Sequence, residues 1–119
     1  METSAFKKAL AATRELEITV TGRKSGRKIS LPVWFVDEAD RVYLLPVKGL
    51  DSPWYKNITQ TPTMTIAAGG TKLTAEPKRI TDARKVKEVA DKFRLKYGTA
   101  DVRKYYSKLD VSVEISLNA

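Results

Sequence analysis

The sequence predicts an α+β domain in which about six strands form a closed or nearly closed barrel covered by helices. Two observations predict this fold. Apolar and polar residues alternate over short stretches, which is the period of half-buried strands. Between residues 81 and 98 the apolar residues instead recur three and four positions apart, which is the period of a helix. The 119 residues contain no repeat or linker, so we expect a single domain spanning 1–119.

The N-terminal part is predicted to form one helix and three strands. Residues 1–12 carry alanine and leucine at helical spacing, which produces one apolar face. Alternating patterns predict strands at 16–20 and 29–35, and a more apolar run predicts a deeply buried strand at 42–47. Pro32 lies inside the second strand. Because proline has no N–H to donate to a neighbouring strand, we expect this strand at a sheet edge or bulged there.

The middle of the chain is predicted to form a short helix and a hairpin. Ser52 is the expected N-cap of a helix over residues 53–60, which begins with a proline. The glycine pair at 69–70 is a strong turn signal, and it predicts a hairpin between strands at 62–68 and 71–80.

The C-terminal part is predicted to contain the long helix, a second short helix and the last strand. Gly98 is expected to end the long helix, because glycine readily adopts the conformation found after a helix C-terminus. Asp101 is the expected cap of a short helix that runs through Ser107. Residues 111–117 alternate again and predict the final strand.

Composition restricts the possible functions. Lys and Arg number 22 against 14 Asp and Glu, and the formal net charge of +8 attracts anions such as nucleotides, acidic cofactors, nucleic acid or lipid head groups. The chain has neither Cys nor His, so thiol catalysis and the usual zinc and haem ligands are excluded, and we expect no metal site. No apolar run approaches the ~20 residues of a membrane span, and the start lacks the apolar core of a signal peptide. We therefore expect a soluble, cytoplasmic protein.

The first candidate site is a cationic turn at residues 21–28. Its two glycines allow the backbone to turn sharply and to aim N–H groups outward, which forms an anion-binding nest that neighbouring cations reinforce. A solvated hairpin tip is the alternative interpretation. The residues expected to hold a phosphate are Arg23, Lys24, Ser25, Gly26, Arg27 and Lys28.

The second candidate site follows about twenty residues later. Lys48 and Gly49 repeat the pairing of a cation with a flexible residue, and Trp54 offers a flat apolar wall. Asn57 carries an amide that can hydrogen-bond a heterocycle. Alternatively, Trp54 anchors the core and Asn57 satisfies backbone groups of the short helix. Together the two stretches predict a phosphorylated small molecule that contains a ring.

These stretches resemble motifs of the deazaflavin-dependent nitroreductase family, split-barrel oxidoreductases that use coenzyme F-420. Members carry a Gly-Arg-Lys-Ser-Gly turn, a strand with proline, a Lys-Gly pair and a Trp-Tyr-x-Asn segment, in that order. The order and coarse spacing hold from about residue 16 to 76. The matching residues are Gly22 to Gly26, Pro32-Val33, Lys48-Gly49, Trp54 to Ile58 and Thr61 to Met64.

The resemblance implies a split β-barrel of the flavin-reductase kind (an FMN-binding split barrel). It implies reduced F-420 as the cofactor and hydride transfer to an electron-poor acceptor such as a quinone, an enone or a nitro compound. Lys48 and Gly49 would lie under the phosphate and linker, and Trp54 and Asn57 would border the ring. Members keep a Tyr beside the substrate, which favours Tyr105 as the catalytic residue. Its neighbour is expected to point away, so that at most one of the two tyrosines faces a pocket.

One departure from the family is that Ile29 stands where many members have an arginine; Arg27 projects on the same face two residues earlier.

Three further expectations concern the cofactor, the assembly and an alternative ligand. FMN is the alternative cofactor. A homodimer is the expected assembly, because proteins of this shape often pair through sheet surfaces. A nucleic-acid-binding module is the less favoured alternative, because the basic residues are spread along the chain instead of forming one stripe interleaved with aromatics.

Overall fold

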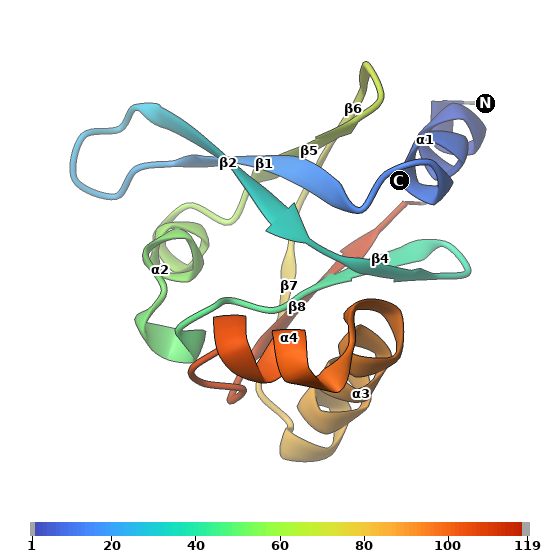
Figure 1. The fold of residues 1–119 in the computed structure, drawn as a ribbon. Coiled ribbons are helices and arrows are strands. Elements are labelled where there is room, and N and C mark those ends of the chain that lie inside the picture. Colours follow the sequence, from blue (N-terminus) through green and yellow to red (C-terminus); the bar gives the residue numbers. More distant parts are fainter. Residues whose placement is uncertain (1, 118–119) are drawn as a thin grey trace.

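The computed structural model describes residues 2–117, with side chains from residue 5 onward. These residues form two antiparallel sheets, four α-helices and one short 3-10 helix (Figure 1). In chain order the elements are α1 (Glu2–Ala11), β1 (Glu15–Thr21), β2 (Lys28–Trp34), β3 (Val36–Glu38), β4 (Arg41–Leu44), η1 (Gly49–Asp51), α2 (Pro53–Gln60), β5 (Met64–Ala68), β6 (Thr71–Ala75), β7 (Lys78–Ile80), α3 (Ala83–Tyr97), α4 (Thr99–Tyr105) and β8 (Ser112–Ser116).

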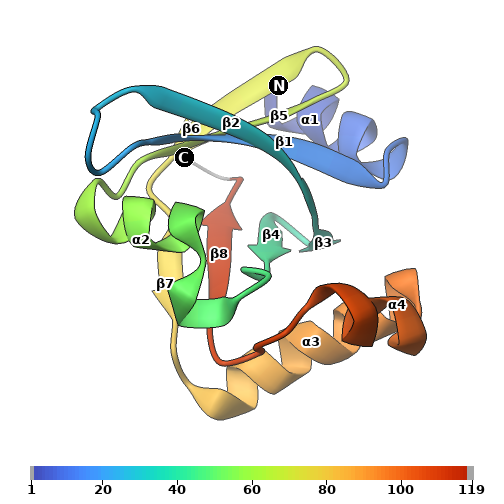
Figure 2. The same ribbon diagram turned by 60° about the vertical axis from the view of Figure 1, so that its left-hand side comes forward.

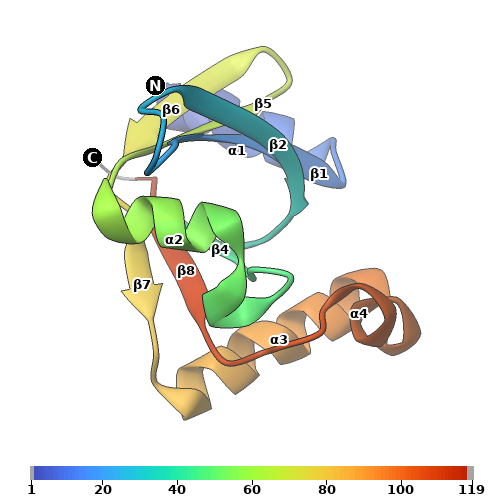
Figure 3. The same cartoon turned by 90° about the vertical axis from the view of Figure 1, so that its left-hand side faces the viewer.

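The two sheets face each other as the halves of a split barrel. One has the strand order β2-β1-β5-β6 and the other β3-β4-β8-β7. Figures 2 and 3 show the first sheet across the top of the molecule, with β4, β8 and β7 below it and α2 at the side. Among the described strands the hydrogen-bonded ladders do not close into one ring. The predicted α+β split barrel is confirmed, with the barrel left open between the sheets.

The number of strands differs from the prediction because two stretches of chain pass from one sheet to the other. The predicted strand at 71–80 becomes β6 and β7, which belong to different sheets and are separated by Glu76 and the buried Pro77. Proline cannot donate to a ladder, so pairing stops there. The chain similarly leaves β2 at Trp34 and enters β3 at Val36. As predicted for a strand containing Pro32, β2 lies at a sheet edge.

The core has two parts, one on each side of the second sheet. Inside the barrel, alternate residues of β1 are buried with residues of β5 in the same sheet and of β4 and β8 in the other sheet, and residues of α1 and α2 belong to the same cluster. On the outer face of the second sheet, α3 and α4 bury a second apolar cluster that includes Phe93 and Tyr97 (Figure 1). The largest side chains that are almost fully buried include Phe6, Leu10, Ile18, Phe35, Tyr43, Met64, Ile66 and Ile115.

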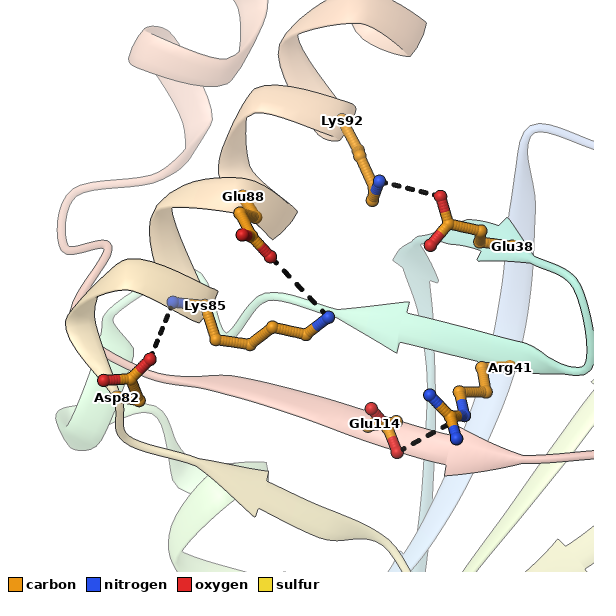
Figure 4. A network of polar contacts seen from close by, with 7 residues as sticks. All are labelled: Glu38, Arg41, Asp82, Lys85, Glu88, Lys92 and Glu114. Carbon is orange, nitrogen blue, oxygen red and sulfur yellow. Dashed lines mark hydrogen bonds and ion pairs between the residues drawn. The ribbon is translucent and has the colours of Figure 1, made fainter.

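Figure 4 shows a network of charged contacts on α3 and on the second sheet beneath it. Lys92 reaches from α3 to Glu38 on β3, with 2.8 Å between Nζ and Oε2. Arg41 on β4 faces Glu114 on β8 at 3.8 Å. Asp82 caps α3 by accepting a hydrogen bond from the backbone N–H of Lys85 at 3.1 Å. Such exposed ion pairs contribute little stability individually, so the apolar cluster beneath them supplies most of the attachment.

The predicted helix limits are confirmed for α2 and α3, but the predicted cap of α4 is wrong. Gly98 ends α3 with φ +98° and also precedes α4, so Asp101 lies within the first turn of α4 and does not cap it. Ser52 is the N-cap residue of α2, as predicted, and its carbonyl accepts a hydrogen bond from the Lys56 N–H at 3.1 Å, but its side chain does not cap the helix. Its Oγ instead accepts a hydrogen bond from the backbone N–H of Lys48 at 2.7 Å. No helix among the described residues is long and apolar enough to cross a membrane.

Candidate functional site

A cavity of about 480 Å³ lies along the free edge of β2. Four consecutive residues of this strand, from Leu31 to Trp34, line it. Since successive strand residues point to opposite faces, a cavity lined by all four must wrap around the strand edge. The remaining wall residues are Glu15, Leu45, Val47, Lys48, Ser52, Pro53, Trp54, Tyr105 and Tyr106. The volume lies within the range of ligand sites, roughly 300–1,000 Å³.

The wall opposite β2 consists of two loops tied together. The backbone N–H of Ser107 donates to the Val47 carbonyl at 2.9 Å, and its Oγ donates to the same carbonyl at 3.2 Å. The ammonium of Lys108 lies 2.8 Å from a carboxylate oxygen of Asp51. This ion pair lowers the pKa of Asp51, through the hydrogen bond and the charge of Lys108. The contacts fix Tyr105 and Tyr106, at the end of α4, beside the loop that carries Lys48.

Gly49 is held by a close backbone approach rather than by an open anion nest. It is buried at φ +55°, and a Cβ at this position would lie 1.9 Å from Oδ1 of Asp110. The same Oδ1 accepts a hydrogen bond from the backbone N–H of Leu50 at 3.2 Å. Gly49 is not in the cavity wall. The requirement for glycine here comes from the turn beneath Lys48, because this turn needs a positive φ and leaves no space for a Cβ.

The cationic hairpin is fastened to α2 through Arg23. The side-chain Oδ1 of Asn57 accepts hydrogen bonds from the backbone N–H of Arg23 at 3.2 Å and from its Nη1 at 2.8 Å. Nη1 also lies 3.3 Å from the carbonyl of Pro53, which lines the cavity. Asn57 is 4% exposed and outside the cavity wall. In this structure its amide oxygen holds the hairpin, a role that neither sequence interpretation included.

The turn itself is closed by its own hydrogen bonds. The Gly22 N–H donates to the Arg27 carbonyl at 2.8 Å, and the Gly26 N–H donates to the Gly22 carbonyl at 2.9 Å. The Ser25 Oγ accepts from the Arg27 N–H at 3.1 Å, and the ammonium of Lys28 donates to Thr21 Oγ1 at 3.0 Å. Among the described residues, none pairs with the side chains of Lys24 and Arg27, both of which are exposed.

The structure brings only part of the predicted set together. Lys48, Trp54 and Tyr105 line the cavity. The hairpin residues 23–28 lie outside the wall but are attached to Pro53 at its rim. Trp54 is 6% exposed and belongs to the barrel core as well as to the cavity, so both sequence interpretations of this residue describe it.

The sequence did not predict three residues of the cavity wall. Glu15 and Trp34 were not considered, and Tyr106 was expected to point away from a pocket. Glu15 and Trp34 face each other in the register of β1 and β2, and both line the cavity. A large aromatic on the opposite side of the strand from Val33 and Phe35 was the available signal for Trp34. Tyr106 also lines the cavity, which corrects the expectation that at most one of the adjacent tyrosines does so. Both tyrosines can line the cavity because Tyr105 is the last residue of α4 and Tyr106 is already in an extended conformation.

An aromatic cluster supports the Trp34 side of the cavity. Trp34 stacks on Tyr97 with ring centres 4.2 Å apart and an interplanar angle of 4°, and it meets Tyr105 edge-on at 5.2 Å and 78°. The Tyr97 hydroxyl accepts a hydrogen bond from the Phe35 N–H at 3.1 Å and donates to the Arg14 carbonyl at 2.7 Å. Burial raises the pKa of Tyr97 and of Tyr106, so both are neutral in the folded protein.

A second hollow of about 440 Å³, between β7 and the start of α3, is strongly charged. Its wall contains Arg41, which pairs with Glu114, and Lys85, which pairs with Glu88 at 3.8 Å (Figure 4). Of the wall residues of this hollow only Ile80 is apolar, so it offers little surface for a ring, and the cavity along β2 is the better candidate site. Among the described residues, no cluster of three or more Asp or Glu side chains could hold a metal ion.

Solved structures of the same fold include several with low sequence identity. An F-420-H2-dependent reductase (FDR-A) is 21% identical, with a TM-score of 0.67 over 87% of this chain and 94% of that chain. A chain described as a domain-swapped dimer is also 21% identical, with a TM-score of 0.68 over 87% and 80%. A candidate pyridoxamine 5'-phosphate oxidase from Listeria innocua is 9% identical, with a TM-score of 0.72 over 100% and 95%. At these identities the likeness shows the fold alone.

No curated protein matches the chain significantly. Residues 7–114, nearly the whole chain, match the family described as "Uncharacterized protein conserved in bacteria (DUF2255)". This split-barrel chain therefore belongs to the DUF2255 family.

Proposed function

We propose that this protein is an oxidoreductase that binds reduced coenzyme F-420 and passes hydride to an electron-poor small molecule. The observation that carries the proposal is the attachment of a cationic hairpin to the rim of an apolar cavity, through the hydrogen bond from Arg23 to the Pro53 carbonyl. A cofactor that combines a phosphate with a flat ring requires both features side by side.

The residues present fit such a cofactor. The cavity wall is mainly aliphatic and aromatic, which suits a ring, and Lys48 adds one cation to it. Beside the rim, Lys24 and Arg27 have no described partner, and they are free to contact a phosphate. Each charge-assisted hydrogen bond to a phosphate contributes on the order of 1.5–3 kcal/mol.

The two ends of the cavity would have different tasks. Arg23, Lys24, Ser25, Gly26, Arg27 and Lys28 would hold the phosphate, with Lys48 beneath it. Trp54 would border the ring, while Gly49 and Asn57 would act through the loop and the hairpin that they hold. At the other end Tyr105 would contact the acceptor, and its hydroxyl would donate a proton or a hydrogen bond there. When bound, reduced F-420 supplies the hydride, and the protein orients the reactants and excludes water.

FMN is the second candidate cofactor, because the same cavity and hairpin would accept its ring and its single phosphate. The absorption spectrum separates the two cofactors. A purified protein that absorbs in the flavin bands would identify FMN, and a protein without these bands that binds added F-420 would exclude FMN as the resident cofactor.

Nucleic acid remains the less favoured ligand. The described basic residues are spread over α1, the hairpin, α2, β6, β7, α3 and α4, which together do not make one stripe. Binding that relies on charge alone weakens steeply with salt. A gel shift that persists at about 200 mM salt would favour nucleic acid over the cofactor proposal.

We also propose a homodimer. The apolar side chains of Ile29, Val47 and Leu50 are 43%, 44% and 50% exposed, which leaves surface for a second copy to cover. Sedimentation at working concentration tests this, and a monomer would exclude the dimer.

Titration with oxidised F-420, followed by deazaflavin fluorescence, tests the proposed function directly. We expect saturable binding, and we expect Lys24→Ala to weaken it while Lys87→Ala, on the outer side of α3, leaves it unchanged. Absence of binding at tens of micromolar cofactor would contradict the proposal.

A further inference from the structure

The ring of Trp34 is the last layer of a stack that ends at the cavity. Tyr97 covers one face of Trp34 at 4.2 Å, and the guanidinium of Arg14 lies over Tyr97 at 5.2 Å. Trp34 lines the cavity whereas Tyr97 and Arg14 do not. Tyr106 lies at a tilt to Trp34, with ring centres 6.1 Å apart and 52° between the planes. Because Tyr97 covers one face of Trp34, a planar ring that stacks on Trp34 from the cavity would use the opposite face.

Tyr105 makes this surface a corner. Its ring is nearly perpendicular to Trp34, at 78° with centres 5.2 Å apart, and it also lines the cavity. A flat guest stacked on Trp34 would meet Tyr105 at its edge, in the arrangement that aromatic rings prefer. Trp34 is held rigidly by Tyr97, whose hydroxyl is bonded to the backbone of Phe35 and Arg14. The corner is thus formed before a ligand binds.

A carboxylate borders the same corner. Glu15 lies directly across from Trp34 in the β1–β2 register and lines the cavity. Among the described residues, Glu15 has no ion-pair partner. Three cations are close to the corner but outside the wall: Arg14 and Lys96 lie over Tyr97 at 5.2 and 5.1 Å, and Lys104 lies 5.6 Å from the ring centre of Tyr105. Within the wall, the charged side chain on the strand pair that carries Trp34 is that of Glu15.

We propose that Trp34 and Glu15 select the acceptor: a planar ring stacks on Trp34, and a hydrogen-bond-donating or positively charged substituent on this ring binds Glu15. The inference rests on the proposed function, because it is the proposed cofactor that occupies the opposite end of the cavity, near Lys48 and the hairpin. Acceptors with a carboxylate on the ring would be disfavoured at this corner.

The position of the ring can be read directly by NMR. The chain has two tryptophans, so its indole N–H signals are two, and a Trp54→Phe variant assigns the signal of Trp34. We would titrate the protein with three probes: 2-naphthylmethylammonium, 2-naphthoate and cyclohexylmethylammonium. They separate the effect of a flat ring from the effect of charge.

We expect 2-naphthylmethylammonium to shift the Trp34 signal saturably. Its Kd should be at least about threefold lower than that of 2-naphthoate read on the same signal, which is the scale of one partly exposed ion pair. Cyclohexylmethylammonium, which keeps the charge but cannot stack, should bind at least about threefold more weakly. Equal binding of the flat and the saturated cation would overturn the stacking role of Trp34.

Two variants test the carboxylate. Glu15→Gln should remove the preference for the cationic probe, whereas Glu17→Gln should preserve it, because Glu17 is exposed on the same strand but outside the cavity wall. The NMR spectrum itself reports whether each variant is folded. A preference that survives Glu15→Gln would overturn the role of Glu15.

The same titration distinguishes failure of this inference from failure of the proposed function. The probes are added without cofactor, so their binding is measured whether or not F-420 binds. Repeating the titration with saturating F-420 should leave the binding of 2-naphthylmethylammonium intact. If F-420 displaces the probe from Trp34, the corner holds the cofactor ring and the acceptor assignment is wrong.

Discussion

Asn57 accepts two hydrogen bonds from Arg23, one from its backbone N–H at 3.2 Å and one from its Nη1 at 2.8 Å. These bonds join the second turn of α2 to the tip of the β1–β2 hairpin, which are 34 residues apart in the chain. The hairpin is long and projects beyond the sheet (Figure 1), so this contact determines where its cations lie.

Replacing Asn57 with Ala should therefore loosen the hairpin and weaken cofactor binding at a distance. Loss of the buried acceptor should lower the free energy of unfolding by about 1–3 kcal/mol, measured by urea denaturation. Asn57→Asp keeps an acceptor for both donors and should restore most of the stability. If Ala and Asp variants are equally unstable, the two hydrogen bonds are not what Asn57 contributes.

Lys24→Ala tests the phosphate end of the site. The lost contact would be made equally in the ground state and the transition state, so cofactor affinity should fall roughly tenfold to a hundredfold while turnover at saturation stays unchanged. Fluorescence titration and steady-state kinetics measure the two quantities separately. A fall in turnover at saturating cofactor would show that Lys24 does more than bind.

Tyr105→Phe tests the acceptor end and removes only a hydroxyl. Cofactor affinity should be unchanged, and turnover should fall because the reduced acceptor loses a donor of a proton or hydrogen bond. Tyr105 is 50% exposed, so the substitution should leave the thermal midpoint of unfolding unchanged. If turnover is unaffected with every acceptor tested, the proton comes from solvent or from another residue.

Gly49→Ala should destabilise the loop beneath Lys48 more than Gly70→Ala destabilises its own turn. Both glycines have positive φ, +55° and +81°, which costs alanine about 1–2 kcal/mol. Only at Gly49 would the new Cβ also meet Asp110, at 1.9 Å, while the space around Gly70 is open. Urea denaturation of the two variants gives the difference, and Asp110→Ala in the Gly49→Ala background should recover part of it. Equal losses for the two glycines would indicate that Asp110 simply moves away.

Stability should decrease above about pH 10. Burial raises the pKa of Tyr97 and Tyr106, whereas in the unfolded chain both ionise near pH 10. A raised folded-state pKa contributes stability below the unfolded value and loses it as pH rises toward the folded value. Burial lowers the pKa of Lys96, which acts in the opposite direction up to about pH 10.5. The free energy of unfolding measured from pH 8 to 11 should fall less steeply for Tyr106→Phe, and an unchanged slope would contradict this account.

The spacing of apolar residues was sufficient to predict most strands and the long helix α3, because burial on one face of an element depends on local sequence. The division of residues 71–80 between two sheets was not predicted, although Pro77 was a visible signal, because a change of sheet depends on the partner strands. Ser52 was correctly predicted as the N-cap of α2, although its hydroxyl bonds Lys48 instead of the helix. The cap at Asp101 was assigned wrongly, because Asp101 lies inside the first turn of α4.

The sequence predicted which residues lie near the candidate site more accurately than which of them line the cavity. Lys48, Trp54 and Tyr105 do line one cavity, whereas Asn57 and Gly49 act one step behind it. Sequence motifs report which residues are needed near a site, but not which of them touch the ligand. Trp34 was missed although its place on the opposite side of the strand from Val33 and Phe35 was visible, and Glu15 was missed because only the strand register places it beside Trp34.

The cavity wall extends in sequence from Glu15 on the first strand to Tyr106 after the last helix. A molecule bound there therefore acts as a non-covalent cross-link between the two ends of the chain. Because the complete wall exists only in the folded chain, the ligand binds the folded state and not the unfolded state. Its binding therefore adds to the stability of the whole domain, by about 2.7 kcal/mol at a free ligand concentration of 100 times its Kd. In a growing chain the pocket is complete only once almost all of the 119 residues have been synthesised, and occupancy then favours the finished fold over its partly folded precursors.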